Sequence, residues 1–334
     1  MRPPAFWSVQ EGREAAPMLR ALLTPLSWAY AAATARRVAQ ASPLRVAAPV
    51  ISVGNLTAGG AGKTPIVRAL CYWLRDHGVD AHVISRGYGG RLRGPLQVDL
   101  QSHTAMDVGD EPCMLAKDLP VWVARDRAAG ARAAIAAGAQ AIVLDDGHQN
   151  PSLCKDLSFV VVDAETGLGN GRVLPAGPLR EPAALGLERA DAVVLMGPGE
   201  PDLPPHGLPL LRGWLQSNAR LRPGPKVAFC GIGRPAKFED TLRALGADIV
   251  SMAPFPDHHP YSPADLDRLR GLARAHGANL VTTEKDAARL GAALPEGTEV
   301  VRVSVRIEGD LARLMAPMAA MAAMAAMAAM AKEK

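Results

Sequence analysis

The stretch from Val50 to Thr64 combines the residue types that hold a phosphate group. A short apolar run ends at Val53, a loop containing four glycines follows, and Lys63 and Thr64 stand just before Pro65. Glycines let backbone N–H groups turn inward around an anion, and the N-terminus of a following helix adds its dipole. The order of strand, loop and helix therefore predicts a phosphate-binding loop.

One position departs from the usual spacing of such a loop. Thr57 stands where the strict pattern has glycine, so an accidental glycine-rich turn is the alternative. Pro65 suits the first turn of a helix, and the apolar spacing up to Leu74 followed by Gly78 indicates where that helix runs and stops. This context favours the phosphate loop. The residues expected to form this loop around the bound phosphates are Thr57, Ala58, Gly59, Gly60, Ala61, Gly62, Lys63 and Thr64.

Acidic residues follow at two later places. Asp145 and Asp146 come directly after an apolar run, and in phosphate-loop enzymes an Asp at the end of a neighbouring strand holds Mg²⁺ directly or through water. We therefore expect Mg²⁺ beside the bound phosphate, with the Thr64 hydroxyl as a further metal ligand. Asp110 and Glu111 precede an expected helix at residues 113–118. Their spacing leaves two alternatives open, a helix cap or a general base that faces the phosphates.

Basic residues and histidines stand in two further loops. Arg86 and Arg91 lie in a glycine-rich segment after an expected strand, where they either hold phosphate or are solvated. Asp257, His258 and His259 precede a helix that opens with a capping box. A metal site there needs ligands that the sequence does not identify, and a surface loop is the alternative. Residues 283–286 also follow an expected strand, where they can simply cap the next helix.

Composition limits the class of protein. The 334 residues are enough for about two domains. The chain is 49% hydrophobic but only 4% aromatic, which indicates aliphatic cores. A net charge of +4 and a pI near 9.0 favour anionic partners such as phosphates or a lipid surface. Nothing resembles a nucleic-acid-binding module. The four cysteines form no CxxC pair, so neither a zinc site nor a disulfide framework is expected.

Strands and helices alternate in the part of the chain that carries the phosphate loop. Short apolar runs typical of strands buried on both faces stand at 48–53, 80–84, 121–124, 141–144 and 159–163. This alternation predicts an α/β fold with a doubly wound parallel sheet, in which ligands collect at the carboxyl ends of the strands.

A second α/β unit is expected nearer the C-terminus. Its strands are expected at 226–230, 248–252, 279–282 and 299–305, and its helices near 236–245, 263–276 and 286–293. The glycine- and proline-rich segment 166–186 is expected to be a substrate loop or a plain linker. The resulting division is a helix region at 1–45, a phosphate-loop domain at 46–195, a proline-rich connection at 196–225, a smaller domain at 226–310 and a tail at 311–334.

Both ends of the chain have unusual composition. Residues 18–30 combine an apolar helical face with Trp28 and Tyr30, flanked by arginines, and are too short and interrupted to span a bilayer. A helix lying in the membrane interface and a helix docked on the protein's own core both fit this pattern. From Met315 to Met330 the chain repeats Met-Ala-Ala, a period of three that drifts around a helix. We expect a frayed helix or a disordered extension there.

Taken together, these motifs resemble the tetraacyldisaccharide 4′-kinases of lipid A biosynthesis. They occur in the family's order across residues 5 to 310, and that family also carries Thr at the position of Thr57. Two positions depart from its pattern, since Asn150 replaces a common His and His148 replaces an apolar residue. The matching segments are 54–65, 85–89, 109–112, Asp145-Asp146-Gly147 with Gln149, 174–178 with Arg180-Glu181, Asp257-His258 and 283–287.

The resemblance implies a fold, an activity and a location. It implies two α/β/α domains with the active site between them, the first resembling phosphate-loop NTPases. It implies transfer of the ATP γ-phosphoryl group to the 4′-hydroxyl of a tetraacylated glucosamine disaccharide 1-phosphate. It further implies a peripheral protein on the cytoplasmic face of the bacterial inner membrane, held there by the N-terminal helix. No nucleic acid and no obligate protein partner are expected.

The resemblance also implies roles for individual residues. Asp110 is expected to be the base that takes the hydroxyl proton, with His258 oriented against it. Lys63 is expected on the β- and γ-phosphates, and Asp145 and Asp146 on Mg²⁺. Second-tier candidates for substrate or metal contacts are Arg86, Arg91, Glu111, Gln149, Arg180 and Glu181.

Two other functions fit parts of the pattern. A nucleotide-dependent switch protein would share the phosphate loop, but a guanine-specific switch needs an Asn/Thr-Lys-x-Asp motif, which does not occur. A soluble kinase or synthetase of small molecules would share the scaffold, but it would not need the apolar helix at residues 19–30.

Overall fold

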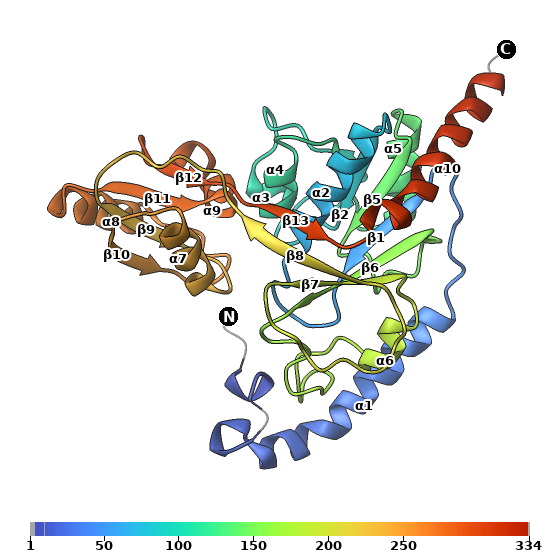
Figure 1. The fold of residues 1–334 in the computed structure, drawn as a ribbon, viewed down its shortest axis with the longest axis horizontal. Coiled ribbons are helices and arrows are strands. Elements are labelled where there is room, and N and C mark those ends of the chain that lie inside the picture. Colours follow the sequence, from blue (N-terminus) through green and yellow to red (C-terminus); the bar gives the residue numbers. More distant parts are fainter. Residues whose placement is uncertain (1–3, 10, 333–334) are drawn as a thin grey trace.

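Two sheets form the body of the protein. The computed structural model describes residues 4–9 and 11–332 (Figure 1). The larger sheet has nine strands in the order β13-β8-β7-β6-β1-β5-β2-β4-β3, and the smaller has four in the order β10-β9-β11-β12. All the neighbouring pairs are parallel except β13 with β8 and β3 with β4. This arrangement confirms the predicted α/β class with a large, mainly parallel sheet.

Strands β1, β2, β4, β5 and β6 of the larger sheet lie where apolar runs predict them, whereas β3 and β7 were not predicted. Strand β1 lies between β5 and β6, so the loops that follow these three strands meet at one edge of the sheet. The bounds are β1 Val50–Gly54, β2 Ala81–Ser85, β3 Leu96–Gln97, β4 Val121–Val123, β5 Ala141–Asp145, β6 Leu157–Asp163, β7 Ala192–Met196, β8 Leu210–Gln216 and β13 Ser304–Glu308.

Helices cover both faces of this sheet. On one face, alternate strand residues pack against α2 (Lys63–Asp76) and α10 (Leu311–Lys332). On the other face, α5 (Arg127–Ala136) contributes to one core cluster and α6 (Ala183–Leu187) to another. The short helices α3 (Ala105–Val108) and α4 (Asp110–Leu115) stand between β3 and β4 in the chain. Because strand residues alternate between the faces, the central strands are buried on both sides.

The smaller domain repeats this plan. Helix α7 contributes to a core cluster different from that of α8, so its sheet also lies between helices. Its elements are β9 Lys226–Cys230, α7 Pro235–Ala244, β10 Ile249–Pro254, α8 Pro263–Ala275, β11 Asn279–Thr283, α9 Glu284–Leu290 and β12 Glu299–Val301. Helix α9 makes an interdomain contact with α4 of the larger domain.

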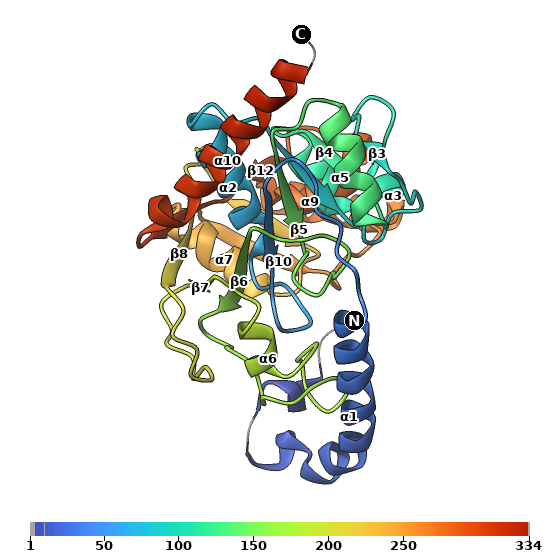
Figure 2. The same ribbon diagram turned by 90° about the vertical axis from the view of Figure 1, so that its right-hand side faces the viewer.

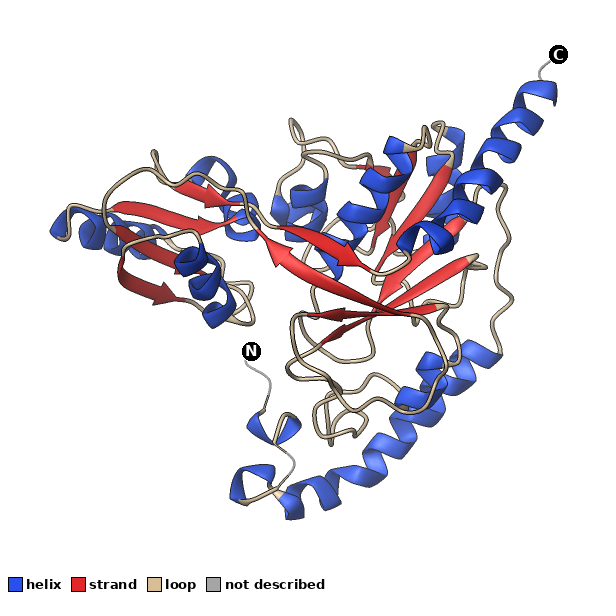
Figure 3. Ribbon diagram, viewed as in Figure 1, coloured by secondary structure: helices blue, strands red, loops and turns tan. Residues whose placement is uncertain are grey.

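Two strands of the larger sheet lie in segments where other structure was expected. Strand β8 falls within the proline-rich range 196–225, and the range expected as one strand at 299–305 contains β12 and the start of β13, which belong to different sheets. Strands β8 and β13 pair antiparallel and run side by side between the domains (Figure 3). Their side chains alternate between more and less buried positions, so neither strand has a continuous apolar run.

Helix α1 (Pro17–Ala39) lies along the outside of the larger domain with its polar side inward (Figure 2). The Ser27 hydroxyl donates to the carbonyl oxygen of Val173 at 2.7 Å and accepts from the N–H of Ala176 at 3.1 Å. The Arg20 guanidinium donates to the carbonyl oxygens of Phe6 and Val9. The apolar side chains that remain exposed on this helix are Met18, Leu19, Leu22, Leu26, Trp28 and Tyr30.

The Met-Ala-Ala tail forms helix α10. Met315, Met318 and Ala322 are buried in the core of the larger domain, whereas Met324 and Met327 are exposed. The repeat of three therefore drifts off the buried face after about two turns, as its period predicts. Among the described helices, the segment Leu311–Ala328 alone is long and apolar enough to cross a membrane by length and composition. Its first half is a packed helix of the domain core.

This packing predicts how the tail contributes to stability. Replacing Met315, which is 0% exposed, with Ala should lower the free energy of unfolding by about 2–5 kcal/mol because a cavity is left behind. Met324→Ala is the matched control, and at 59% exposure it should change stability by less than about 0.5 kcal/mol. Urea unfolding of both variants measures the difference. Equal midpoints would mean that α10 does not dock as described.

Candidate active site

The phosphate loop leads from β1 into α2. Gly62 has φ +83° and directly precedes Lys63, the first residue of α2, so a left-handed residue turns the chain into the helix. The side chain of Asn55 bridges the loop, because its amide donates to the carbonyl oxygen of Thr57 at 2.7 Å and its carbonyl oxygen accepts from Lys63 Nζ at 2.9 Å. The loop thus has its turn, its helix and its lysine in one assembly.

The glycine- and proline-rich segment runs beside this loop. The N–H of Ala58 donates to the carbonyl oxygen of Pro178 at 2.7 Å, and the N–H of Arg180 donates to that of Leu56 at 2.8 Å. Thr57 and Leu179 form an antiparallel bridge. Thr57 therefore lies where a second segment pairs with the loop, and this pairing places Arg180 beside the phosphate loop.

Asp146 joins the two segments electrostatically. Arg180 Nη1 lies 2.9 Å from Asp146 Oδ1, and Lys63 Nζ lies 3.4 Å from the same oxygen. Burial opposes ionisation of this carboxyl, but Lys63 and Arg180 outweigh it and hold the pKa of Asp146 below its usual range. The side-chain amide of Gln149 donates to the backbone carbonyl oxygen of Asn55, at 3.0 Å, and to Glu181 Oε1, at 3.0 Å.

Asp145 is a buried carboxyl group with one unpartnered oxygen in the described part of the chain. It ends β5 beside β1, is buried, and its Oδ1 has no hydrogen-bond partner within the part of the chain that the structure describes. Burial and the nearby negative charges of Glu111 and Asp146 raise its pKa to about 7, against the opposing charge of Lys63.

These residues fit Mg²⁺. In the described chain, no three His, Cys, Asp or Glu side chains form a metal-binding group of their own. Mg²⁺ in kinase sites instead takes one or two carboxylates together with substrate phosphates. A cation between Asp145 and the phosphate loop would satisfy the unpartnered oxygen and offset the crowded negative charge.

Asp110 meets His258 across the junction of the two domains. Gly109, at φ +94°, turns the chain just before it, and a Cβ there would lie 2.5 Å from the Tyr88 carbonyl oxygen, so only glycine fits. His258 Nδ1 donates to Asp110 Oδ2 at 2.9 Å. Asp110 therefore bonds across to the small domain rather than capping a helix. Arg289 also donates to Asp110 Oδ2.

A lysine of α9 stands on the other side of the histidine. Lys285 Nζ lies 3.2 Å from Glu111 Oε1 and 3.3 Å from His258 Nε2. Because lysine can only donate, His258 Nε2 is the accepting nitrogen of this contact. Tyr88 places its ring edge-on to His258, with 5.8 Å between the ring centroids. His258 is thus held from both domains.

Other candidates from the sequence have structural partners. Arg91 pairs with Asp107 at 2.5 Å, and Arg86 is exposed on the loop after β2. Glu181 is buried and paired with Arg189 at 2.6 Å. His259 bonds to Asp265, at 3.0 Å, and stacks on the Phe255 ring.

The two departures from the family pattern also have a local explanation. His148 is buried, its Nε2 donates to the Gly186 carbonyl oxygen at 2.8 Å, and burial lowers its pKa to about 4. It packs against the phosphate strand so closely that a Cβ on Gly54 would lie 2.4 Å from the His148 Cβ. Asn150 accepts from the N–H and hydroxyl of Ser152 and so shapes a turn. Neither side chain contacts Lys63, Asp110 or Asp145 in any of these bonds.

Sequence reasoning did not assign roles to Asn55, Lys285 or Arg289. Asn55 and Lys285 lie within the motifs quoted above. Their polar side chains next to a turn were the available sign that they belong to the site. Arg289 is one turn of helix beyond Lys285, at a spacing that places both on a similar side of α9. Nothing in the sequence indicated that this side faces Asp110.

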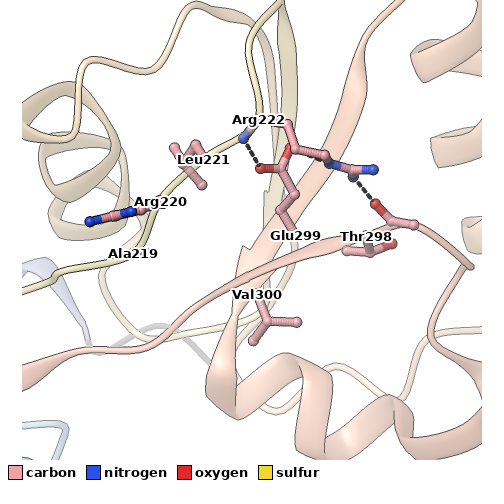
Figure 4. Close-up of a pocket in the computed structure, with 8 residues that line it drawn as sticks. Ala219, Arg220, Leu221, Arg222, Thr298, Glu299 and Val300 are labelled. Carbon is pink, nitrogen blue, oxygen red and sulfur yellow. Dashed lines mark hydrogen bonds and ion pairs between the residues drawn. The ribbon is translucent and has the colours of Figure 1, made fainter.

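Two surface hollows lie away from this network. One of about 380 Å³ is lined by residues 219–222 and 297–300 (Figure 4). There Glu299 accepts from the N–H of Arg222 and from the buried Lys226, so its charge is already compensated within the protein. A larger hollow, of about 760 Å³, lies between the 165–172 turn and the 201–205 loop, and Leu179 lines it. Neither hollow includes a phosphate-loop residue.

Comparison with known proteins gives one consistent result. A family model described as tetraacyldisaccharide-1-P 4′-kinase matches residues 19–321. The tetraacyldisaccharide 4′-kinase of Rhodospirillum centenum is 54% identical over 327 residues, which cover 95% of this chain and 97% of the relative. That of Caulobacter vibrioides is 53% identical over 321 residues, covering 92% of this chain and 96% of the relative.

A solved structure agrees with these sequence matches. The crystal structure of LpxK from Aquifex aeolicus in complex with ATP superposes with a TM-score of 0.73 at 28% sequence identity, and covers 90% of this chain and 99% of the other. The family match along most of the chain, the relatives at about half identity and the similar solved structure lead to one conclusion. The chain belongs to the tetraacyldisaccharide 4′-kinase family, the kinases of lipid A biosynthesis.

Proposed function

We propose that this chain transfers the γ-phosphoryl group of ATP to the 4′-hydroxyl of a tetraacylated glucosamine disaccharide 1-phosphate. The observation that carries the proposal is the hydrogen bond between Asp110 and His258, which come from two domains. Glu111, next to Asp110, interacts with Asp145 and so connects this pair to the phosphate loop. Phosphoryl transfer needs mainly positioning and charge neutralisation, together with a group that accepts the hydroxyl proton. The relatives named above carry this substrate in their names, which supports its choice.

The nucleotide end of the site follows from the contacts of the phosphate loop. Residues 57–64 hold the phosphates, and Lys63 leaves Asn55 and Asp146 to contact the β- and γ-phosphates. Asp145, Asp146 and the Thr64 hydroxyl hold Mg²⁺, which supplies positive charge for the phosphoryl oxygens as negative charge shifts between them. Arg180 stays on Asp146 and keeps that carboxylate ionised and oriented.

The acceptor end uses the dyad. The pKa of Asp110 is lowered, because His258 and Arg289 together outweigh the effect of burial, so the carboxylate is ionised at neutral pH. Such a base is weak, yet it suffices where the proton leaves late, in a loose transition state. Exposed Arg86 is the second-tier candidate for the anionic groups of the substrate, whereas Arg91 would first have to release Asp107.

We further propose that α1 attaches the protein to the cytoplasmic face of the inner membrane as a peripheral protein. Its polar side is hydrogen-bonded to the domain, so its exposed leucines, Trp28 and Tyr30 are available to a lipid surface. Tryptophan and tyrosine favour the headgroup level, and arginines at the end of the helix suit anionic lipids. An acylated substrate would then be reached without leaving the membrane.

The first test concerns the nucleotide end. Lys63→Ala should lower kcat for the disaccharide by roughly 10²–10³-fold, because a charge that stabilises the transferred group is lost. Lys117→Ala, at an exposed lysine of the same domain, is the control and should keep full activity. The assay is ATP-dependent phosphorylation of the disaccharide in detergent micelles. Unchanged turnover in Lys63→Ala would exclude this phosphate loop as the ATP site.

The second test concerns the dyad. Asp110→Ala and His258→Ala should each lower kcat while the ATP dissociation constant stays near wild type. A general base contributes about 10²–10⁴-fold, and the double variant should be little worse than the poorer single one because the pair acts as a unit. Measuring kcat, ATP affinity and Tm on all three separates catalysis from folding. Near-normal kcat with a lowered Tm would reduce Asp110 to a structural residue.

The third test concerns the membrane. The double variant Leu22→Glu and Leu26→Glu changes side chains that are 74% and 58% exposed, so the fold should persist. Each buried leucine contributes about 1.5–3 kcal/mol, so binding to anionic phospholipid vesicles should weaken by at least roughly 10²-fold in a sedimentation assay. Met324→Glu on α10 is the control. If only the control is released from vesicles, the tail and not α1 makes the contact.

A further inference from the structure

We propose that Arg289 is a positioning residue for phosphoryl transfer, which fixes the Asp110 carboxylate so that Oδ1 alone faces the acceptor hydroxyl. This inference deepens the proposed function and rests on it. It concerns a residue that neither the sequence motifs nor the dyad itself includes.

The contacts of Arg289 are those of a clamp. Its Nε and Nη2 donate to Asp110 Oδ2 at 2.9 and 2.5 Å, while Nη1 donates to Asp286 Oδ1 at 2.7 Å. Nη1 also lies 3.2 Å from the carbonyl oxygen of Gly231. The side chain is 9% exposed, so the guanidinium is held away from bulk water. A planar fork with several donors fixes both position and orientation, which a flexible ammonium group does not.

Asp286 fixes the orientation of the Arg289 guanidinium. It is fully buried and accepts from the Gly231 N–H at 3.0 Å and from the Tyr261 hydroxyl at 2.9 Å, both on Oδ1. Its Oδ2 accepts from the Thr283 hydroxyl at 2.6 Å, which ties it to the start of α9. Four donors around one buried carboxylate leave it little freedom to turn. Arg289 is therefore aimed by the core of the small domain.

This arrangement distinguishes the two oxygens of Asp110. Oδ2 accepts from His258 and from two nitrogens of Arg289, whereas Oδ1 has no hydrogen-bond partner among the residues that the structure describes. An oxygen that already receives three donors is a poor acceptor for another proton. In the transfer step the acceptor oxygen bonds to the γ-phosphorus, the bond from that phosphorus to the bridging oxygen breaks, and its electron pair leaves with ADP. The hydroxyl proton passes to Asp110 Oδ1.

Arg289 also acts electrostatically on the Asp110 carboxylate. Its positive charge, with the hydrogen bond from His258, lowers the pKa of Asp110 against the effect of burial. Weakening the clamp should therefore raise that pKa and move the acidic limb of the kcat profile to higher pH. The titratable groups around Asp110 that the variant leaves in place are His258, Lys285, Glu111 and Asp286.

The test compares two arginine-to-lysine substitutions in the small domain. Arg289→Lys keeps the charge but cannot reach Asp110 with two nitrogens and Asp286 with a third. It should lower kcat by roughly 10²-fold through misplacement of the base, leave the KM for ATP unchanged and shift the acidic limb upward. Arg222→Lys is the matched control, since Arg222 bonds to Gly297 and Glu299 in the hollow of Figure 4, and it should behave as wild type.

A second comparison separates positioning from folding. In the Asp110→Asn background, the further change Arg289→Lys should lower kcat by less than about twofold relative to Asp110→Asn alone. The reason is that the two residues act on one step. If Arg289→Lys does not fold, Tyr261→Phe removes one donor from Asp286 and should lower kcat without changing the KM for ATP. Wild-type kcat and pH profile in Arg289→Lys, with only a lower Tm, would overturn the inference. No transfer to the disaccharide by wild type and by Arg222→Lys would instead overturn the proposed function, and the inference with it.

Discussion

A buried ion pair between Arg68 and Glu284 sets the geometry on which the site depends. The two side chains are each 5% exposed, and Arg68 Nη1 lies 2.9 Å from Glu284 Oε2. Arg68 is on the helix that begins with Lys63, and Glu284 begins the helix that carries Lys285 and Arg289. Losing one partner of such a pair costs about 3–5 kcal/mol because the other charge is left buried and alone. Helix α2, which follows the phosphate loop, and helix α9 of the small domain are therefore fixed to each other.

Opposite charges alternate through the site on either side of this pair. Near the phosphate loop, Arg180 and Lys63 share Asp146, and at the domain junction Lys285 and Arg289 hold Glu111 and Asp110. Asp146, Asp110 and Glu111 each pair directly with a lysine or an arginine. Asp145 remains with an unpartnered oxygen and a raised pKa. A phosphoryl-transfer enzyme benefits from such fixed charges, because they position the reactants without reorganising during the reaction.

Local features of the chain were predictable and long-range ones were not. The phosphate loop, its helix and the central strands follow from glycine spacing and continuous apolar runs, which act within a few residues. The pairing of β8 with β13 joins segments about 90 residues apart, and their alternating pattern resembles that of a loop. Arg289 was missed for a similar reason, since its partner Asp110 is 179 residues away. For α1 the sequence left two alternatives, and its polar side chains dock while its apolar ones stay outside.

The antiparallel pair β8 and β13 makes the smaller domain an insertion within the larger one. The chain leaves the large sheet after Gln216, builds the whole four-stranded sheet, and returns at Ser304 to add the last edge strand and then α10. During synthesis the large sheet consequently stays open at one edge, and its Met315 face stays uncovered, until the inserted domain has emerged from the ribosome. The inserted domain has its own core clusters and can close first. Completion of the phosphate-binding domain is therefore the last event in the assembly of the enzyme.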